Sequence, residues 1–411
     1  MSCCETEMTN RMNKRFTILI EDDWEVMGNG LGNVAQLQYL PSMFFMKLAK
    51  RLGIKLTFMV DVVQQLEYNK HVQSDYNLRL QKNLWDDSVR LMKSYGFDVQ
   101  LHLHPQWMNA RKDGDHFYLS DNWNFGRYSE AEQDHLISES VNYLHELLRP
   151  IDPSYKVVAY KGGSWGLQPS GSLLRNMEKH GIRIVTGVRQ GMYLPGNGVD
   201  YRSLEEDTMP YYPVYEDLCK VSAEKKAVFI IPLQSVKPGV MGLGYLAIDM
   251  VKRKISKKDS MRHFYADGKV PEKIYALSPI AEESKPKFPY VSYTTHLKIG
   301  NQPFSYLKTS FDQVIKKLSG TPHQHIPVLI ECHTKQYNNY YGDIERFLAY
   351  VQDTYGDVAE FNTLSGYLAD IEAGLTFEAD EAIGQRQQRR ASAAKAGTSA
   401  TPGKAAPKKR G

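Results

Sequence analysis

The chain has 411 residues, of which 42% are hydrophobic and 24% charged, so it can bury a full core in one or two domains. Its four cysteines show no CxxC spacing, the N-terminus has no apolar signal-peptide region, and no stretch approaches the roughly 18 apolar residues of a membrane span. These features argue against a disulfide scaffold and a membrane protein. We therefore expect a soluble, cytoplasmic protein.

The formal net charge of +4 is concentrated at the C-terminus. From Gln385 to Gly411 the sequence has eight basic residues and no acid, which leaves a mildly acidic body. This segment has almost no apolar side chains to bury, so we predict a disordered basic tail over residues 376–411. A solvated tail accounts for the charge, and we expect no specific nucleic-acid partner. Residues 1–15 are predicted to be a flexible N-terminus.

The first predicted strand begins at Phe16 and is apolar until it ends in three consecutive acids, Glu21, Asp22 and Asp23. A glycine-rich loop follows, whose glycine spacing does not match a dinucleotide-binding fingerprint. The next expected elements are a helix over 42–52, a strand over 54–60 and a long helix over 74–95. This order is typical of alternating β and α units.

The following predicted strand, 98–104, carries two histidines. Apolar Val99, Leu101 and Leu103 alternate with polar residues there, which is the pattern of a strand with two different faces. This alternation points His102 and His104 the same way, close enough to share one metal ion. An ordinary HxH on the wet face of a strand is the alternative interpretation.

The remaining elements continue the alternation of strands and helices. We expect helices at 129–148, 169–180, 304–318, 344–355 and 364–373, and strands at 156–160, 182–186, 227–232, 326–332 and 358–362. The charged, proline-rich stretch at about 237–300 is interpreted as an insertion. The pattern predicts one α/β domain over 16–375, a distorted or incomplete (β/α) barrel of seven to eight parallel strands.

Three of the predicted strands end in acids or histidines. They are the strands at 16–23, 98–104 and 326–332, and the last is followed by His333 and Lys335 after Glu331. A buried central strand is otherwise a continuous apolar run, and parallel α/β folds carry their chemistry at the carboxyl ends of such strands. We therefore expect the three ends to converge on one cavity.

The order of these motifs resembles that of the polysaccharide deacetylase superfamily (NodB-homology, carbohydrate esterase family 4 type). Its opening Asp-Asp is similar to Asp22-Asp23, its His-x-x-x-His-Pro motif to the segment ending at His104-Pro105, its aromatic third motif to Tyr160–Trp165, and its late Leu-x-His to Glu331-Cys-His333. The chain departs from the family at Gln100, which stands at the first motif histidine, and at Lys161, which replaces an arginine.

The resemblance implies a role for each matched residue. Asp23, His102 and His104 would hold a divalent metal, with zinc as the expected ion and other transition metals as alternatives, Asp22 as general base and His333 as general acid. Adjacent residues of a regular strand point to opposite faces, so this assignment requires the backbone to turn after Asp22. Without such a turn, Glu21 and Asp23 are the inward pair and Glu21 becomes the candidate base.

Further residues near these motifs are candidates for substrate binding. Trp107 and Trp165 are expected at the rim of the site, where aromatic rings stack on sugars, although either could be a core residue. Glu331 is expected to orient His333, and the substrate-binding candidates also include Lys161 and Lys335. The remaining histidines of this region, His296, His323 and His325, are interpreted as ordinary surface or turn residues.

The expected function is metal-dependent hydrolysis of a carbohydrate, as N-deacetylation of a polysaccharide, oligosaccharide or sugar precursor. Two alternatives stay open. One is a non-catalytic sugar-binding protein on the same barrel, which Gln100 and Lys161 make plausible. The other is a glycosidase that uses Glu21, Asp23 and Glu331 as its carboxylates, which would leave the HxH pair without a role.

Overall fold

One curved parallel sheet forms the centre of the computed structural model, which describes residues 14–237 and 295–376 apart from 29, 31, 115, 301, 338 and 339, together with 244, 248 and 251. The strand order is β12-β7-β6-β3-β2-β1-β16-β15, and β17 also pairs with β1. The strands are β1 (Arg15–Trp24), β2 (Thr57–Asp61), β3 (Asp98–Leu103), β6 (Ala159–Gly162), β7 (Ile184–Thr186), β12 (Phe229–Ile230), β15 (Lys298–Ile299), β16 (His325–Cys332) and β17 (Ala359–Asn362).

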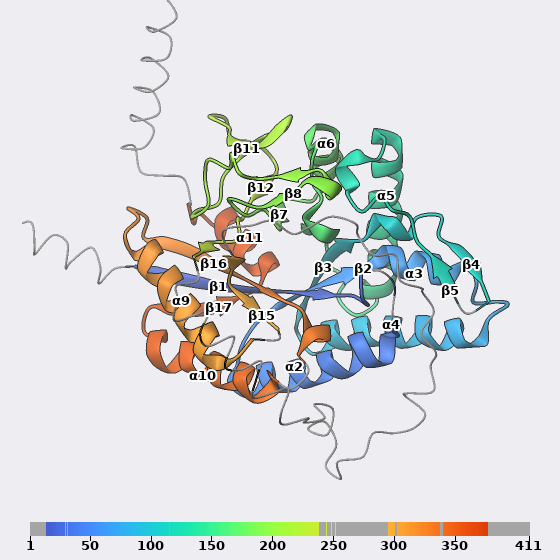
Figure 1. Ribbon diagram of the computed structural model, residues 1–411, viewed down its shortest axis with the longest axis horizontal. Helices are drawn as coiled ribbons and strands as arrows, with labels where there is room; N and C mark the ends of the chain where they lie inside the picture. Colours follow the sequence, from blue (N-terminus) through green and yellow to red (C-terminus); the bar gives the residue numbers. More distant parts are fainter. Residues whose placement is uncertain are drawn as a thin grey trace, which may run out of the picture.

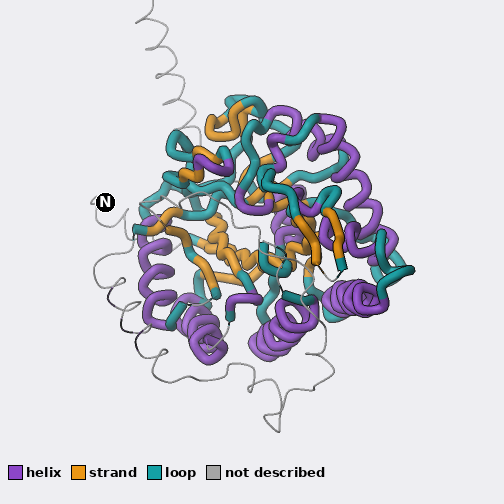
Figure 2. The backbone as a smooth tube through the Cα atoms, turned by 45° about the vertical axis from the view of Figure 1, so that its right-hand side comes forward, coloured by secondary structure: helices purple, strands orange, loops and turns teal. Residues whose placement is uncertain are grey.

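Helices cover the outside of this sheet, and the strands lie inside the arc that they form (Figure 1, Figure 2). The α-helices are α2 (Leu40–Leu52), α3 (Val62–Asn69), α4 (Tyr76–Ser94), α5 (Glu130–Leu148), α6 (Gly171–Lys179), α9 (Phe304–Ser319), α10 (Tyr341–Tyr355) and α11 (Leu364–Glu372). A π-helical segment, η1 (Ala35–Tyr39), leads into α2. The predicted distorted (β/α) barrel is confirmed by this arrangement.

Local sequence signals explain where some of these helices begin. Ser129 and Glu132 form the predicted capping box at the start of α5. Helix α3 was not expected, because it follows β2 without a loop. Asp61 ends β2 and caps α3 by accepting a hydrogen bond from the Val63 N–H.

Short two-stranded pairs and 3-10 turns lie in the connections between the main strands. The paired short strands are β4 (Arg111–Asp113) with β5 (His116–Tyr118), β8 (Tyr193–Leu194) with β9 (Val199–Asp200), β10 (Pro213–Val214) with β11 (Asp217–Val221), and β13 (Ser235–Val236) with β14 (Thr295–His296). The 3-10 turns include η2 (Pro105–Trp107), η4 (Gly163–Trp165) and η7 (Thr334–Gln336). The connections η2, η4 and η7 directly follow β3, β6 and β16.

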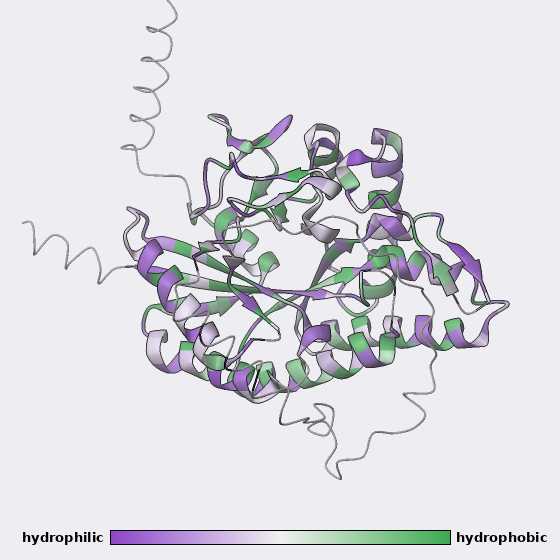
Figure 3. Cartoon of the chain, in the orientation of Figure 1, coloured by the Kyte–Doolittle hydropathy of each residue, from purple (hydrophilic) through white to green (hydrophobic). Residues whose placement is uncertain are grey.

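Apolar residues face the space between the helices and the sheet, and β1 becomes hydrophilic toward its carboxyl end (Figure 3). The apolar half of β1 contributes Phe16, Ile18, Leu19 and Ile20 to the core. The acids that follow are also buried, with Glu21 and Asp22 fully inaccessible to solvent. Buried acids require partners, because an isolated buried charge is costly.

Three predictions fall wholly or largely outside the described residues. They concern the flexible N-terminus, most of the insertion at 237–300 and the basic tail. The described end of the insertion region contributes β14 and β15, the second of which pairs with β16 in the main sheet. Among the described helices, none is both long and apolar enough to span a bilayer.

Candidate active site

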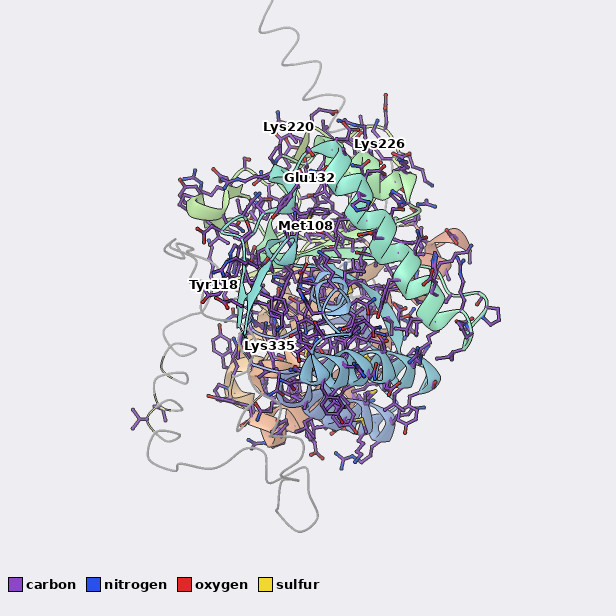
Figure 4. The ribbon with its side chains drawn as sticks, turned by 90° about the vertical axis from the view of Figure 1, so that its right-hand side faces the viewer. Met108, Tyr118, Glu132, Lys220, Lys226 and Lys335 are labelled. Atoms are coloured by element: carbon purple, nitrogen blue, oxygen red, sulfur yellow. The ribbon has the colours of Figure 1, made fainter. Side chains whose placement is uncertain are left out.

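The polar strand ends identified in the sequence lie at the same edge of the sheet. In the parallel register, Glu21 of β1 pairs with Glu331 of β16, while His102 of β3 pairs with Asp61 of β2 and with Lys161 of β6. Figure 4 views the molecule from the side toward which the carboxyl end of β1 points, and labels Lys335 there. The structure therefore brings the carboxyl ends of the three strands together.

Two imidazoles and one carboxylate form the first group at this edge, here named the histidine cluster: Glu25, His102 and His104. One ligand atom from each lies within 4.8 Å of the others, and all three residues are buried. The Glu25 Oε2 atom contacts His104 Nε2 directly and lies 3.3 Å from His102 Nε2. Two nitrogen donors and one oxygen donor are the ligand types of a catalytic zinc site.

Neighbouring groups orient each member of the histidine cluster. The Nδ1–H of His102 donates to the Lys161 carbonyl at 2.9 Å, which leaves Nε2 of the neutral ring with a free lone pair. Lys335 contacts the other carboxylate oxygen of Glu25 and donates to the Val26 carbonyl at 2.9 Å. Such outer partners are typical of metal-ligating side chains.

The ring of His104 is held by close packing. A Cβ atom added at Gly163 would lie 2.9 Å from His104 Nδ1 and 2.6 Å from the Leu103 carbonyl oxygen. Only glycine fits at this position without moving the histidine or the backbone of β3. The second glycine of Lys161-Gly-Gly-Ser-Trp165 is thus explained by the approach of η4 to His104.

A second group, here named the acid cluster, consists of Asp23, Glu331 and His333. One ligand atom from each lies within 4.8 Å of the others. Nε2 of His333 is 3.2 Å from Asp23 Oδ2, and its Nδ1 is 3.5 Å from Glu331 Oε1. The imidazole therefore lies between two buried carboxylates.

The ammonium group of Lys161 occupies the space between three carboxylates. Its Nζ is 3.0 Å from Glu21 Oε1, 2.8 Å from Asp23 Oδ1 and 2.9 Å from Glu331 Oε2. Lys161 is 1% exposed, so these contacts are in a low-dielectric environment. The single positive charge of Lys161 offsets part of the cost of burying these three acids.

Glu331 accepts contacts from several further donors. The Trp165 indole N–H donates to its Oε2 at 3.0 Å, while His296 Nε2 and Lys298 Nζ lie 3.1 and 3.3 Å from its Oε1. Trp165 is half-buried and has a positive φ of 56°, a conformation unusual for a large side chain. The Tyr201 hydroxyl donates to the Trp165 carbonyl at 2.5 Å and supports this conformation.

The charged neighbours set the protonation states at this edge. Burial opposes a charge on His102, but the carboxylates of Asp23 and Glu25 raise its pKa to about 9. Burial and the nearby Lys298 ammonium lower the pKa of His333 well below its usual value. Without a metal, His102 is therefore cationic at neutral pH and His333 is neutral.

The pKa values of the buried acids are also shifted in opposite directions. Burial would raise the pKa of Glu25, but His104 and Lys335 hold it well below its usual value. Burial raises the pKa of Glu21 to about 7 against the effect of Lys161. Glu25 is therefore a permanent carboxylate, whereas Glu21 changes protonation near neutral pH.

Asp22 lies on the opposite face of β1 from these groups, because β1 continues to Trp24 without a turn. Its Oδ1 accepts from the Thr334 N–H at 2.8 Å, and its Oδ2 accepts from the Thr334 hydroxyl at 3.0 Å. Burial raises the pKa of Asp22 to about 7. The general-base role expected for Asp22 thus lacks the required position, and the inward residues are Glu21 and Asp23.

The structure changes two further expectations. Glu25, and not Asp23, completes the group with His102 and His104. Trp107, expected at the rim, is 1% exposed and packs against Tyr68 and Phe117 in an aromatic core cluster. It is therefore a core residue.

Two residues at this edge were not predicted as site residues from the sequence. Glu25 continues the two-residue alternation of Glu21 and Asp23 beyond the end of β1, and this signal was available. His296 was interpreted as a surface or turn residue but is 4% exposed and contacts Glu331. Its position depends on the pairing of β14 with β13, which no local pattern indicates.

Two surface cavities lie away from this edge. One, of about 460 Å³, is lined by Arg15, Phe16 and other residues at the amino end of β1. Another, of about 540 Å³, surrounds Asp98 at the amino end of β3. Neither cavity is lined by a residue of the histidine cluster or the acid cluster. The candidate site is therefore defined by the converging side chains.

No family model and no curated protein sequence matches the chain. Among solved structures, a putative polysaccharide deacetylase from Mycobacterium smegmatis is 10% identical with a TM-score of 0.47, over 90% of this chain and 94% of that one. A probable polysaccharide deacetylase from Pseudomonas aeruginosa is 14% identical with a TM-score of 0.42, over 87% and 90%. A GH57-type branching enzyme from Pyrococcus horikoshii is 11% identical with a TM-score of 0.44, over 90% and 72%. Similarity at this level does not identify a function.

Proposed function

We propose that the protein is a metal-dependent hydrolase that removes acyl groups from N-acylated carbohydrates. The observation that carries the proposal is the histidine cluster, in which two buried imidazoles and the Glu25 carboxylate converge. This donor set suits zinc and also accommodates other transition metals. The carbohydrate part of the proposal rests on the order of the sequence motifs, which resembles that of the polysaccharide deacetylases.

The residues present fit such an ion. Nε2 of His102 is available as a ligand, and Lys335 holds the second oxygen of Glu25, which leaves Oε2 for the metal. His104 requires one adjustment, because the Gln106 amide N–H donates to its Nδ1 at 2.7 Å. A half-turn of this amide would place Oε1, which has no hydrogen-bond partner among the described residues, on Nδ1–H and free Nε2. The same half-turn would break the bond that the NH₂ group donates to the Gly28 carbonyl at 2.8 Å.

A bound divalent ion would supply an activated water and polarise the acyl oxygen. His333 is neutral at neutral pH, so it can accept a proton at the reacting centre and return it to the departing amine. Asp23, 3.2 Å from His333 Nε2, stabilises the imidazolium formed in that step. Burial raises the pKa of Asp23, and the nearby Lys161 ammonium opposes this effect by favouring the carboxylate form.

A glycosidase mechanism is less compatible with the acid cluster. Such enzymes place a sugar between two carboxyl groups. Here the Lys161 ammonium already lies within 3.0 Å of Glu21, Asp23 and Glu331 and fills the space between them.

A non-catalytic sugar-binding protein is the second candidate, and a specific observation favours it. Each acid that could take part in chemistry already has a lysine partner: Lys335 for Glu25 and Lys161 for Asp23. A cationic His102 also balances the charge without a metal. Metal content distinguishes the two candidates.

The test is to purify the chain without chelators, measure bound zinc, iron, cobalt and manganese, and assay acetate release from tetra-N-acetylchitotetraose. We expect close to one metal per chain and loss of both metal and acetate release in His104→Ala. The matched control is His135→Ala, because His135 is exposed on α5. Metal-free wild-type protein would contradict the proposal and favour the sugar-binding alternative.

A further inference from the structure

Asp22, for which the family resemblance implies the role of general base, lies in a different environment from the reacting groups. Both carboxylate oxygens of Asp22 accept hydrogen bonds from one residue, Thr334, through its backbone N–H and its hydroxyl. All of these atoms are buried. A two-point contact of this kind fixes both the position and the direction of the Thr334 backbone.

Thr334 stands between two side chains of the candidate site. His333 precedes it and lies between Asp23 and Glu331, and Lys335 follows it and contacts Glu25. Thr334 also begins η7, the turn by which the chain leaves β16. The direction of this turn determines where both flanking side chains point.

We propose that Asp22 is a positioning residue: by clamping Thr334 from the rear face of β1, it holds His333 at the acid cluster and Lys335 on Glu25. The inference rests on the proposed function. It assigns to Asp22 no proton transfer and no contact with substrate or metal. The Thr334 N–H and hydroxyl groups are buried donors that need an acceptor. Asp22 is that acceptor, which explains the presence of a buried acid behind the site.

The isosteric variant Asp22→Asn separates this role from that of a base. Its amide oxygen can still accept the Thr334 N–H, and its NH₂ group can donate to the Thr334 hydroxyl. We expect kcat for acetate release from tetra-N-acetylchitotetraose to stay within about threefold of wild type, whereas loss of a general base costs about 10²–10⁴-fold. Asp22→Ala, which removes both bonds, is expected to lower kcat by at least tenfold with KM and metal content unchanged.

Amide hydrogen exchange at Thr334 provides a readout that does not depend on activity. Exchange should accelerate by at least tenfold in Asp22→Ala and stay near the wild-type rate in Asp22→Asn. Thr334→Val keeps the N–H bond and loses the hydroxyl bond, so its kcat should fall between those of the two Asp22 variants. If the wild-type protein holds no metal and releases no acetate, the proposed function fails and the exchange data alone test the clamp.

The proposal is overturned if Asp22→Asn loses as much kcat as Asp22→Ala while Thr334 keeps its protection, because Asp22 would then act as a base. It is also overturned if Asp22→Ala leaves the exchange of Thr334 unchanged. Melting temperatures of all three variants show that the compared proteins are folded at the assay temperature.

Discussion

Strand β3 carries buried polar side chains at both of its ends, and the two ends are paired in different ways. At the amino end, the Asp98 carboxylate accepts from Thr57, Gln100 and the backbone and hydroxyl of Ser365. The Gln100 carbonyl oxygen accepts from two backbone N–H groups at 2.7 and 2.9 Å. We call these four side chains the amino-end network.

At the carboxyl end of β3 the side chains are held by ion pairs, and some buried polar atoms have no hydrogen-bond partner. His104 Nε2, Asp23 Oδ1 and Glu331 Oε1 have no hydrogen-bond partner among the described residues, although each lies close to a charged side chain: Glu25, Lys161 and Lys298, respectively. Buried polar groups in folded proteins are normally hydrogen-bonded, and exceptions require an explanation such as a ligand or a catalytic role. Complete pairing therefore marks the amino end as structural, and incomplete pairing marks the carboxyl end as the site.

The comparison also explains the departure of Gln100 from the deacetylase motif. Gln100 points into the amino-end network and contacts Asp98, two residues earlier on the strand, whereas His102 and His104 lie at the other end. The position that resembles the first motif histidine is thus used for strand and loop assembly in this chain.

The largest expected effect of a single substitution is on the rate of hydrolysis at the carboxyl end. His333→Ala should lower kcat about 10²–10⁴-fold with metal content unchanged, because the side chain transfers protons and is not a ligand. The matched control is His325→Ala at the exposed amino end of the same strand, β16. Acetate-release kinetics and metal analysis check both variants. Equal rates for His333→Ala and His325→Ala would contradict the assignment of chemistry to one end.

Removal of the ammonium group from the acid cluster should cost stability. Lys161→Met leaves Glu21, Asp23 and Glu331 buried without their common partner, which is expected to lower the free energy of unfolding by about 3–5 kcal/mol at pH 7. Urea unfolding followed by circular dichroism measures this change. The loss should be smaller at pH 5, where protonation of the carboxyls replaces the missing charge. A loss below about 1 kcal/mol at pH 7 would show that solvent reaches the cluster.

A substitution in the amino-end network should affect stability alone. Gln100→Leu leaves the N–H groups of Val158 and Ala159 without their acceptor, with an expected loss of about 2–4 kcal/mol in the free energy of unfolding. Metal content should stay at the wild-type value, and Gln100→His should gain no additional metal. Loss of metal in Gln100→Leu would mean that the two ends are coupled.

A pH dependence of stability is expected from Asp22. Its pKa is raised to about 7 in the folded chain from an ordinary value near 4, so the folded state favours the protonated form. This contribution to stability is fully present below about pH 4 and is lost as the pH rises through about 7. The Asp22→Asn side chain cannot ionise, so this variant does not lose the contribution as the pH rises. The melting temperature of Asp22→Asn minus that of the wild-type protein should therefore increase from pH 4 to pH 8. A constant difference between the two proteins would contradict the raised pKa.

Most of the fold could be predicted from the sequence, because apolar runs and helical periodicity are local properties. The strands ending at Trp24 and Cys332 and the helices starting at Glu130 and Phe304 lie close to their expected positions. Helix α3 was missed because no loop separates it from β2. Its only starting signal is the single cap at Asp61.

Only part of the candidate site could be predicted from the sequence. The physical reason why a residue was predicted or missed differs between residues. Alternation along a strand placed His102 with His104 and allowed Glu21 to be the inward residue. The same alternation reaches Glu25, which was overlooked because it lies one residue beyond the end of β1. His296 could not be predicted, since its contact with Glu331 depends on pairing between segments distant in sequence.

The central claim is that Glu25, His102 and His104 at the carboxyl end of the sheet hold a metal ion. The most direct test is the metal content of wild type, Glu25→Ala and Asp23→Ala, purified side by side without chelators and measured by mass spectrometry. We predict close to one metal per chain in wild type and Asp23→Ala, and almost none in Glu25→Ala. Full metal content in Glu25→Ala, or none in the wild-type protein, would contradict the account.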